Sequence, residues 1–505
     1  MTDYLIGVDI GTQGTKAALF DRELTQIATS FVPSRLISPA PGTVWQEPDD
    51  LYDSCVEALR LLMEQSGVDG RRIAAIGLDG QMAGIMGVDE NGQATTYYDS
   101  WLDMRCGEYA SLMQEQAGED IIRISGGPVT YVHAPKILWW KHEHPEAYKK
   151  TAYFVLPHTY VTGRMTGLRG DEIYFDYTHL HFSCLADNYK KEWSRDLLDA
   201  FAIDAAKMPR IVSPFMIVGK TTASFADASG TAAGIPVVAG CGDTAASTFG
   251  SGMFDKDSVL DCAGTASVLC SVVDSYVPDV THATMTMMRS PVDGLWLPLA
   301  YVNGGGLCIR WFRDTLTGDP RASYDDLQAE AEKVLPGSEG LLFLPHFSGR
   351  VLPNDPHQKG CFIGLDNKHT RAHMYRAILE SIAYEYRYYL SVLRALYPQS
   401  RFDKLVCIGG GANSSLFNQI KADVLGIQVE TFQTGETALI GSAVIAGCGT
   451  GLLKDYRDPI RKVMERQAAY VQDAVSHAAY RPCANAYLKA LESISAFYRA
   501  QPFTE

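Results

Sequence analysis

Apolar residues recur along the chain with two different periods, and segments of the two kinds alternate from one end to the other. A period of two predicts strands, and a period between three and four predicts helices. The predicted strands cover residues 4–9, 16–21, 72–78, 85–88, 94–98, 235–239, 258–262, 267–273 and 404–408. Helices are predicted over residues 48–65 and 370–396. This alternation predicts an α/β fold.

Asn91-Gly92 lies between two predicted strands, and this dipeptide is typical of a tight hairpin turn. We therefore expect residues 85–88 and 94–98 to pair with each other.

A weak internal repeat links the two halves of the chain. Val8-Asp9-Ile10-Gly11-Thr12 resembles the segment from Leu260 to Thr265, since each is a strand, an aspartate and a Gly-Thr turn followed by a second strand. The repeat predicts two similarly built halves facing one another, with a boundary near 253–257. We expect an N-terminal domain over 1–252, a C-terminal domain over 253–453, and a helical tail over 454–505 that packs on the body.

Length and charge narrow the possible functions. A chain of 505 residues is too long for one hydrophobic core, which agrees with two large domains. The net charge is -15 and no basic block stands out, which argues against a nucleic-acid partner. A bound phosphate would have to be met locally by backbone amides.

The chain shows no signal peptide and no run of 18 apolar residues, so we expect no contact with a membrane. Its eleven cysteines include no Cys-x-x-Cys pair. Such cysteines are typical of reduced, buried thiols, and we expect a cytoplasmic protein.

The segment from Asp9 to Lys16 places glycines between two predicted strands. A glycine turn of this kind can hold phosphate oxygens with its amides, and Thr12 and Thr15 add hydroxyl donors. Asp9 stands at the strand end, where a carboxylate could hold Mg²⁺. A plain hairpin explains the same residues equally well.

Gly240-Cys241-Gly242-Asp243 follows a predicted strand and opens an apparent helix. Three interpretations fit: a dinucleotide-binding turn, a helix cap, and a general base. The carboxylate of Asp243 argues against the dinucleotide-binding turn, because it places a negative charge at the helix N-terminus where a pyrophosphate would bind. As a base, Asp243 is expected to be ionised, with the helix dipole holding its pKa low.

A third glycine turn, Gly409-Gly410-Gly411, ends the strand 404–408. Glycines let a flat ring approach the backbone, and Asn413 could bind a purine or ribose edge.

Taken together, these segments resemble the FGGY carbohydrate kinase family, on the two-domain actin/Hsp70/sugar-kinase (ribonuclease H-like) fold. The resemblance runs from about Leu5 to Gly451, and its most specific part spans 360–380, which fits the family's C-terminal signature throughout. Ser348-Gly349-Arg350 lacks the family's glutamate, and Trp140 and His142 depart from its N-terminal signature.

The resemblance implies a cleft between the domains that binds ATP and Mg²⁺. Asp243 matches the catalytic aspartate and Asp9 the residue near the metal. The residues implied for the nucleotide are Gly11, Thr12, Gln13, Thr15, Lys16, Gly264, Thr265, Gly305, Gly306, Gly410, Gly411 and Asn413. A homodimer is a further expectation from the family.

On the sugar side, Gln81-Met82-Ala83-Gly84 resembles the Gln-Met-His-Gly of xylulose kinases, with Ala83 in place of the histidine. Trp101 and Asp103 match the family's Trp-x-Asp-x-Arg, whose aromatic ring and carboxylate face the substrate. The loss of one hydrogen bond to a substrate hydroxyl costs about 1–3 kcal/mol, enough to change substrate preference.

The sequence thus predicts a kinase that phosphorylates a hydroxyl of a small sugar or polyol, with a ketopentose such as xylulose favoured. Two alternatives remain open: an ATP-binding switch of the actin or chaperone type, and an NAD(P)-dependent oxidoreductase.

Overall fold

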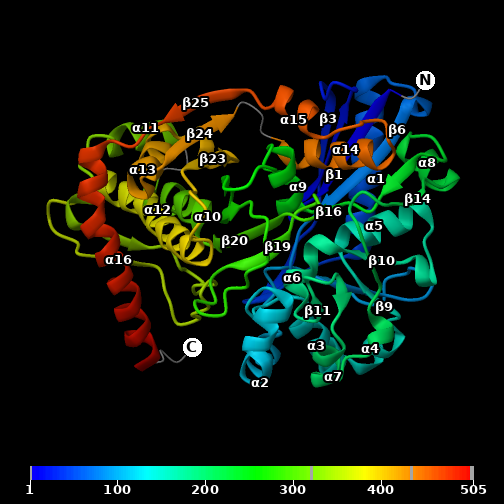
Figure 1. Cartoon of the computed structure of the whole chain (residues 1–505), viewed down its shortest axis with the longest axis horizontal. Helices are drawn as coiled ribbons and strands as arrows, with labels where there is room; N and C mark the ends of the chain where they lie inside the picture. Colours follow the sequence, from blue (N-terminus) through cyan, green and yellow to red (C-terminus); the bar gives the residue numbers. More distant parts are fainter. Residues whose placement is uncertain (1–2, 319–321, 433–435, 501–505) are drawn as a thin grey trace.

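Two mixed sheets, each flanked by helices, form the two halves of the molecule (Figure 1). The computed structural model describes residues 3–318, 322–432 and 436–500. The first sheet has the order β14 (Ile217–Lys220), β15 (Pro236–Val238), β6 (Ile73–Gly80), β1 (Tyr4–Ile10), β2 (Gly14–Phe20) and β3 (Gln26–Pro33), with β16 (Cys241–Gly242) also on β6. The second has the order β19 (Thr286–Arg289), β20 (Trp296–Val302), β18 (Ser267–Ser271), β17 (Val259–Ala263), β23 (Lys404–Ile408), β24 (Gln428–Phe432) and β25 (Arg466–Tyr470).

The main helices of the first half are α1 (Pro48–Ser66), α2 (Gly107–Ser125), α3 (His133–Glu143), α5 (Pro157–Thr166) and α9 (Asp243–Gly250). Those of the second half are α10 (Gly305–Trp311), α11 (Tyr324–Ala331), α12 (Arg371–Leu396), α13 (Ser415–Leu425), α14 (Thr437–Gly449), α15 (Arg457–Val463) and α16 (Ala474–Ala500).

The predicted internal repeat appears as equivalent strand pairing in both sheets. β1 pairs antiparallel with β2 and parallel with β6, and β17 pairs antiparallel with β18 and parallel with β23. The α/β prediction is therefore confirmed, and the strands that carry the two Asp-Gly-Thr segments occupy matching places.

The hairpin predicted at Asn91-Gly92 forms. Asp89 N donates to Gln93 O at 2.8 Å and Thr95 N to Gly87 O at 2.9 Å, and the flanking segments meet in antiparallel bridges at Val88–Ala94 and Ile85–Asp99. Both segments also have partners outside the hairpin, which the sequence did not predict. β7 (Met86–Val88) pairs with β9 (Tyr153–Val155), and β8 (Tyr98–Asp99) pairs with β5 (Thr43–Gln46). All three residues of β7 are buried.

The tail after residue 453 is not wholly helical. Between α15 and α16 it contributes β25, which pairs antiparallel with β24 and completes the edge of the second sheet. α16 then runs along the outside of the second half (Figure 1).

α14 belongs to the second half by sequence but packs on the first sheet, against β1 and β6 (Figure 1). Gly7 and Gly77, register partners on these strands, allow this contact. A Cβ atom at Gly7 would lie 2.1 Å from Leu439 O, and one at Gly77 would lie 2.1 Å from Ser442 O. Glycine is thus required at both places so that the helix backbone can rest on the sheet.

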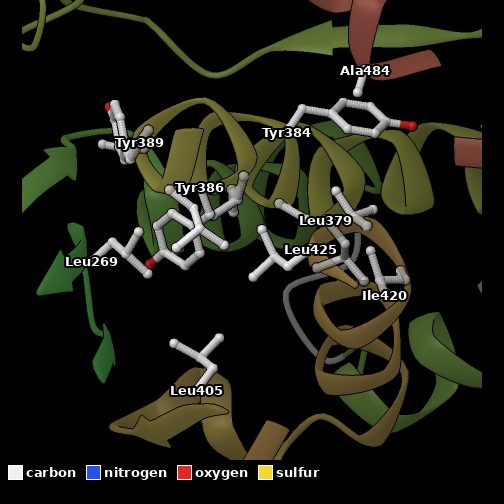
Figure 2. Packing of buried hydrophobic residues seen from close by; sticks show 14 of the residues in the cluster. Leu269, Leu379, Tyr384, Tyr386, Tyr389, Leu405, Ile420, Leu425 and Ala484 are labelled. Carbon is white, nitrogen blue, oxygen red and sulfur yellow. The ribbon is translucent and has the colours of Figure 1, made fainter. Parts of the chain in front are cut away.

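The core of the second half forms around α12, which lies between the sheet and α16. Figure 2 shows Tyr386 on the side of Leu269, and Tyr384 directed toward Ala484 of α16. All four side chains are buried. Because opposite faces of one helix are both covered, α12 is apolar over most of its surface.

No helix in the described ranges is both long and apolar enough to cross a bilayer. All eleven cysteines are unpaired; seven are buried and four are partly exposed.

Candidate active site

Three strand ends of the first sheet bring carboxylates together at one edge. Asp9 near the end of β1 and Asp79 near the end of β6 are register partners, and Cys241 of β16 pairs with Asp79 from the other side. Asp243 follows two residues later as the first residue of α9. Because the carboxyl ends of parallel strands meet at one edge, residues 9, 79 and 243 become neighbours.

Asp243 is held by the backbone that follows it. Its Oδ1 accepts hydrogen bonds from Thr244 N at 2.5 Å and Thr244 Oγ1 at 3.1 Å. Burial raises the pKa of Asp243, while the bonds from Thr244 oppose that rise. The expectation of a lowered pKa is therefore wrong in direction, because loss of solvation outweighs the favourable helix terminus.

Asp79 is a site residue that the sequence analysis missed. Its Oδ2 accepts a hydrogen bond from Ser442 Oγ at 2.6 Å, while Oδ1 is buried and has no donor partner. Burial, and then the negative charge of Asp9, raise the pKa of Asp79 well above its ordinary value. Burial and the charge of Asp243 likewise raise the pKa of Asp9 to about 7. The raised pKa of Asp79 favours its protonated form, which can donate a hydrogen bond to Asp9.

A signal for Asp79 was present in the sequence. In Leu78-Asp79-Gly80, an aspartate at the end of a predicted strand is followed by a glycine, as in the Asp9 and Asp261 segments. Here the glycine follows the aspartate directly, whereas in the other two segments residues stand between them.

The two aspartates of the repeat have different surroundings. Asp261 is fully buried, and its Oδ2 forms an ion pair with Lys421 Nζ at 2.7 Å, while Tyr386 donates to Oδ1 at 2.5 Å. The repeat therefore preserves the strand geometry, but only the Asp9 copy lies at the cleft.

Two cavities meet at Asp243. The nucleotide-side cavity has a volume of about 290 Å³ and includes Asp9, Lys16, Asp243, Gly264, Gly409 and Glu436 in its lining. The sugar-side cavity, of about 220 Å³, includes Thr12, Met82, Ala83, Trp101, Asp243 and Asn303. Asp243 and Thr244 line both, so the wall between the cavities carries a carboxylate.

Glu436 is a second residue missed by the sequence analysis. It precedes α14, and both its carboxylate oxygens lie 3.1 Å from Lys16 Nζ across the two halves. Each side chain is 41% exposed, so the ion pair is solvated and can be exchanged for a ligand anion at little cost. No local sequence pattern distinguishes this glutamate from other residues before a helix.

The other residues of the first predicted phosphate loop have two kinds of position: some hold the loop in shape, and others are exposed to solvent. Gly11 N donates to Gly14 O at 3.1 Å and closes the turn. Thr15 is buried, with its hydroxyl 2.7 Å from Ser54 Oγ, so it is directed into the domain. Gln13 is exposed at the tip of the loop.

Glycines of α10 support the second predicted phosphate loop. A Cβ at Gly306 would lie 2.2 Å from Gly264 O, and one at Gly305 would lie 2.1 Å from Ser267 Oγ. Thr265 is exposed, and its carbonyl accepts from Leu307 N at 3.0 Å. These glycines thus let α10 approach the loop closely, without lining either cavity themselves.

Gly410, Gly411 and Asn413 form a short 3₁₀ turn after β23, and Gly410 and Asn413 are exposed. The preceding residue, Gly409, lines the nucleotide-side cavity, but these three residues do not. A Cβ at Gly411 would lie 2.6 Å from Ala263 Cβ, so this glycine is needed for packing against β17.

Trp101 is held in the wall of the sugar-side cavity by a hydrogen bond. Its Nε1 donates to Thr12 Oγ1 at 2.9 Å, and both residues line the sugar-side cavity. Gln81 is buried behind them, where its Oε1 accepts from the same Thr12 hydroxyl at 3.2 Å. Gln81 therefore positions the loop and does not itself reach the cavity.

Ala83 lies in the left-handed region with φ 63° and lines the sugar-side cavity. An L-residue with a Cβ is strained in this region, and such strain is common at ligand sites.

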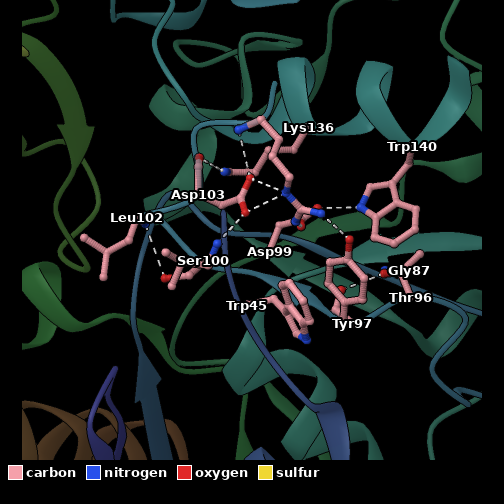
Figure 3. A network of polar contacts seen from close by, with 12 residues as sticks. Trp45, Gly87, Thr96, Tyr97, Asp99, Ser100, Leu102, Asp103, Lys136 and Trp140 are labelled. Carbon is pink, nitrogen blue, oxygen red and sulfur yellow. Dashed lines mark hydrogen bonds and ion pairs between the residues drawn. The ribbon is translucent and has the colours of Figure 1, made fainter. Parts of the chain in front are cut away.

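The structure does not bring Asp103 to the cavity. Its carboxylate accepts bonds from Val44 N at 2.7 Å and from Arg105 Nε at 2.8 Å, and the residue is 2% exposed (Figure 3). Arg105 also pairs with Asp99 at 2.7 Å and lies over the ring of Trp139. Asp103 thus belongs to a polar network that supports the cavity wall.

A buried histidine cluster lies behind Asp243. Asp176 Oδ2 lies 3.1 Å from His158 Nε2 and 2.8 Å from His179 Nδ1. Thr178, which bonds to Asp176, accepts a hydrogen bond from Gly242 N at 3.0 Å. The cluster therefore fixes the turn that carries Asp243.

Comparisons with known proteins agree on one family. Residues 4–250 match the N-terminal domain of the FGGY family of carbohydrate kinases, and residues 262–450 match its C-terminal domain. The chain is 28% identical over 486 residues to a xylulose kinase of Bacillus subtilis (strain 168), covering 96% of both chains. It is 26% identical over 472 residues to a gluconokinase of Bacillus licheniformis, covering 90% of this chain and 89% of that one.

Among solved structures, a ligand-bound xylulose kinase from Lactobacillus acidophilus superposes with a TM-score of 0.90 at 23% identity, covering 98% of this chain and 99% of that one. This likeness confirms the predicted two-domain sugar-kinase fold. The family matches exclude the oxidoreductase and the switch without kinase activity. The chain belongs to the FGGY family of carbohydrate kinases.

Proposed function

We propose that this kinase transfers the γ-phosphoryl group of ATP to a hydroxyl of a neutral ketopentose such as xylulose, with Asp243 as the general base. The position of Asp243 in the wall shared by the two cavities carries the proposal. A group placed there contacts both a sugar hydroxyl on one side and a terminal phosphate on the other.

The geometry of Asp243 suits proton acceptance. Both hydrogen bonds from Thr244 reach Oδ1, which leaves Oδ2 to accept the proton of the substrate hydroxyl. Its raised pKa brings the carboxyl closer to the operating pH, where general bases are most effective. Thr178 holds the preceding amide, so the carboxylate is oriented before substrate binds.

The nucleotide-side cavity supports binding of ATP. Lys16 faces it from the first half and Gly264 from the second, so a triphosphate there would bridge the two halves. A phosphate can replace Glu436 as the partner of Lys16, because that ion pair is solvated. Closure around both ligands would exclude water from the transferred group.

The carboxylates at the strand ends fit Mg²⁺. Asp9 and Asp243 line the same cavity, where the charge of Asp243 helps to raise the pKa of Asp9, and Asp79 is the register partner of Asp9; together they form a site of oxygen ligands. Such hard oxygen donors are preferred by Mg²⁺. The metal would supply charge neutralisation at the phosphates.

The sugar-side cavity favours a small neutral substrate. Its volume of about 220 Å³ is below the usual range for ligand pockets, which suits a monosaccharide. None of its lining residues, all in the described ranges, is a lysine, arginine or histidine. Asn303 Oδ1 is buried without a hydrogen-bond donor and can accept one from a sugar hydroxyl. A sugar acid such as gluconate would lack a cationic partner here.

A coupled ADP-release screen tests this proposal with xylulose, ribulose, xylitol and gluconate at saturating Mg·ATP. We expect the neutral ketopentoses to give the highest kcat/KM. Turnover of gluconate above every neutral sugar would exclude the neutral-substrate assignment, and no stimulation by any polyol or sugar would exclude the sugar-kinase reaction at this site.

A further inference from the structure

A third cavity, of about 660 Å³, lies in the second half between α12, the end of α13 and the start of α16. These helices are adjacent on the left of Figure 1, on the far side of the second sheet from the first half. Its polar lining residues are Arg387, Ser391, Arg394, Gln472, His477 and Arg481. None of them lines the nucleotide-side or sugar-side cavity, so this is a separate place on the molecule.

Among the described residues, the three arginines of this cavity form no ion pair with a carboxylate. Arg387 donates to Val424 O at 3.2 Å and Arg394 to Phe402 O at 3.3 Å. No carboxylate of the described chain forms an ion pair with either residue or with Arg481. Burial lowers the pKa of Arg387, and the charge of Arg481 lowers it further. Burial and the charge of Arg387 have the same effect on the pKa of Arg394, so the three cations repel one another.

The nearby acids are already engaged elsewhere. Asp423 Oδ1 accepts from Asp473 N at 2.7 Å and from Gln419 Nε2 at 2.9 Å, and Asp473 caps the start of α16 through Ser476 N at 2.8 Å. Asp403 attracts Arg394 without forming an ion pair. Arg394 and Arg481 are exposed and Arg387 is partly buried, so in a chain of net charge -15 their three positive charges face one open, solvated cavity and attract an anion there.

Two further features favour an anion. The cavity lies at the N-terminal end of α16, a helix of 27 residues, whose dipole adds positive potential. His477 Nδ1 lies 2.7 Å from Asp423 O, and because a carbonyl only accepts, this nitrogen donates. The ring is thereby fixed beside the arginines.

The number of arginines indicates the charge of the anion. Arg387 and Arg394 are seven residues apart on α12 and so lie on one face of that helix, and Arg481 reaches the same cavity from α16. A guanidinium binds phosphate oxygens through two parallel N–H groups, so each arginine suits one phosphoryl group.

We propose that this cavity binds a small anion with two or more phosphoryl groups, at a site separate from phosphoryl transfer. The guanidinium groups of Arg387, Arg394 and Arg481 contact the phosphoryl oxygens, and His477 and Ser391 complete the polar wall.

Calorimetric titration with inorganic tripolyphosphate tests the site, using the full chain in EDTA with excess ADP so that the nucleotide-side cavity is occupied. We expect 1:1 binding that persists with ADP. Arg394→Gln and Arg481→Gln should each weaken it about tenfold or more, since each removes a charge-assisted contact. Inorganic phosphate should bind more weakly than tripolyphosphate.

The matched control is Arg195→Gln, which removes one positive charge from an exposed position on α7 (Arg195–Ala200) of the first half. It should leave the affinity unchanged. Thermal unfolding followed by circular dichroism checks that each variant is folded. Binding abolished by ADP, equal affinity in the Arg394→Gln/Arg481→Gln double variant, or an equal loss in Arg195→Gln would each overturn the proposal.

Discussion

Aspartates of similar sequence context have different partners in this kinase, and the tertiary structure decides which. Asp261 forms a buried ion pair with Lys421, whereas Asp9 and Asp79 lie beside each other, and burial raises the pKa of both. Burial also raises the pKa of Asp243, whose Oδ1 accepts both hydrogen bonds from Thr244. At the residue scale, the site therefore depends on which carboxylates lack a cationic partner.

Asp243→Asn tests the proposed base. The amide keeps the shape and the size of the side chain but cannot accept the hydroxyl proton, so kcat should fall by about two orders of magnitude or more. ATP binding should be retained, since the nucleotide contacts lie on other residues. Steady-state ADP release and binding of a fluorescent ATP analogue measure the two quantities, and near wild-type turnover would exclude Asp243 as the base.

Asp79 is expected to act as a neutral hydrogen-bond donor to Asp9. Asp79→Asn preserves a donor toward Asp9 and an acceptor for Ser442, so its kcat should stay within about tenfold of the wild-type value. Asp79→Ala removes both bonds and should lower the free energy of unfolding by about 1–3 kcal/mol. Urea unfolding and ADP release compare the pair, and equal behaviour of the two variants would contradict a donor role.

At the scale of elements, α14 decides how the two halves are joined. It arrives from the second half, lies on Gly7 and Gly77 of the first sheet, and crosses α9 where a Cβ at Gly441 would lie 2.2 Å from Ala246 O. The same helix brings Ser442 to Asp79, and Glu436 just before it faces Lys16. A small change in its position would therefore alter both the sheet contact and the site.

Gly77→Ala should lower the free energy of unfolding by about 1–3 kcal/mol or more, because its Cβ would overlap Ser442 O. Gly163→Ala is the matched control, since it lies in α5 with no atom within 4 Å of the added Cβ. There the same substitution should raise stability by about 0.5–1 kcal/mol, as alanine favours a helix. Urea unfolding of both variants checks the opposite signs.

On the scale of the whole molecule, buried histidines couple folding to pH. Burial, and then the neighbouring His179, lower the pKa of His181 to about 3. Below about pH 6.5 the unfolded chain binds a proton at this residue that the folded chain does not. The folded state therefore loses stability as the pH falls from 6.5 toward 3.

His181→Phe removes this linkage while keeping a buried ring. Between pH 7.5 and pH 5.0, the free energy of unfolding of the wild type should fall by about 2 kcal/mol relative to the variant. Urea unfolding at the two pH values measures the difference. The exposed His357→Gln serves as control and should show the wild-type dependence; a His181→Phe variant with that same dependence would refute the linkage.

Much of the fold followed from local pattern. β23 spans the same residues as predicted, and α1 and α12 agree with prediction to within one residue, because their hydrophobic periods match their secondary structure. The hairpin at Asn91-Gly92 also followed from local pattern, but the further pairing of β7 with β9 did not, since that partner is 67 residues away. β25 was missed for the same reason, because a short edge strand gains its stability from β24.

The sequence by itself determined the α/β class, the repeat, the glycine turns and the family signature, since each depends on residues near one another in the chain. Only the tertiary structure decided which aspartates face the cleft, that Asp103 accepts a hydrogen bond from Val44 N, and that α14 joins the first sheet. It also brought together the three arginines of α12 and α16. The reason is that charge, burial and close approach depend on partners far away in sequence, which no local pattern specifies.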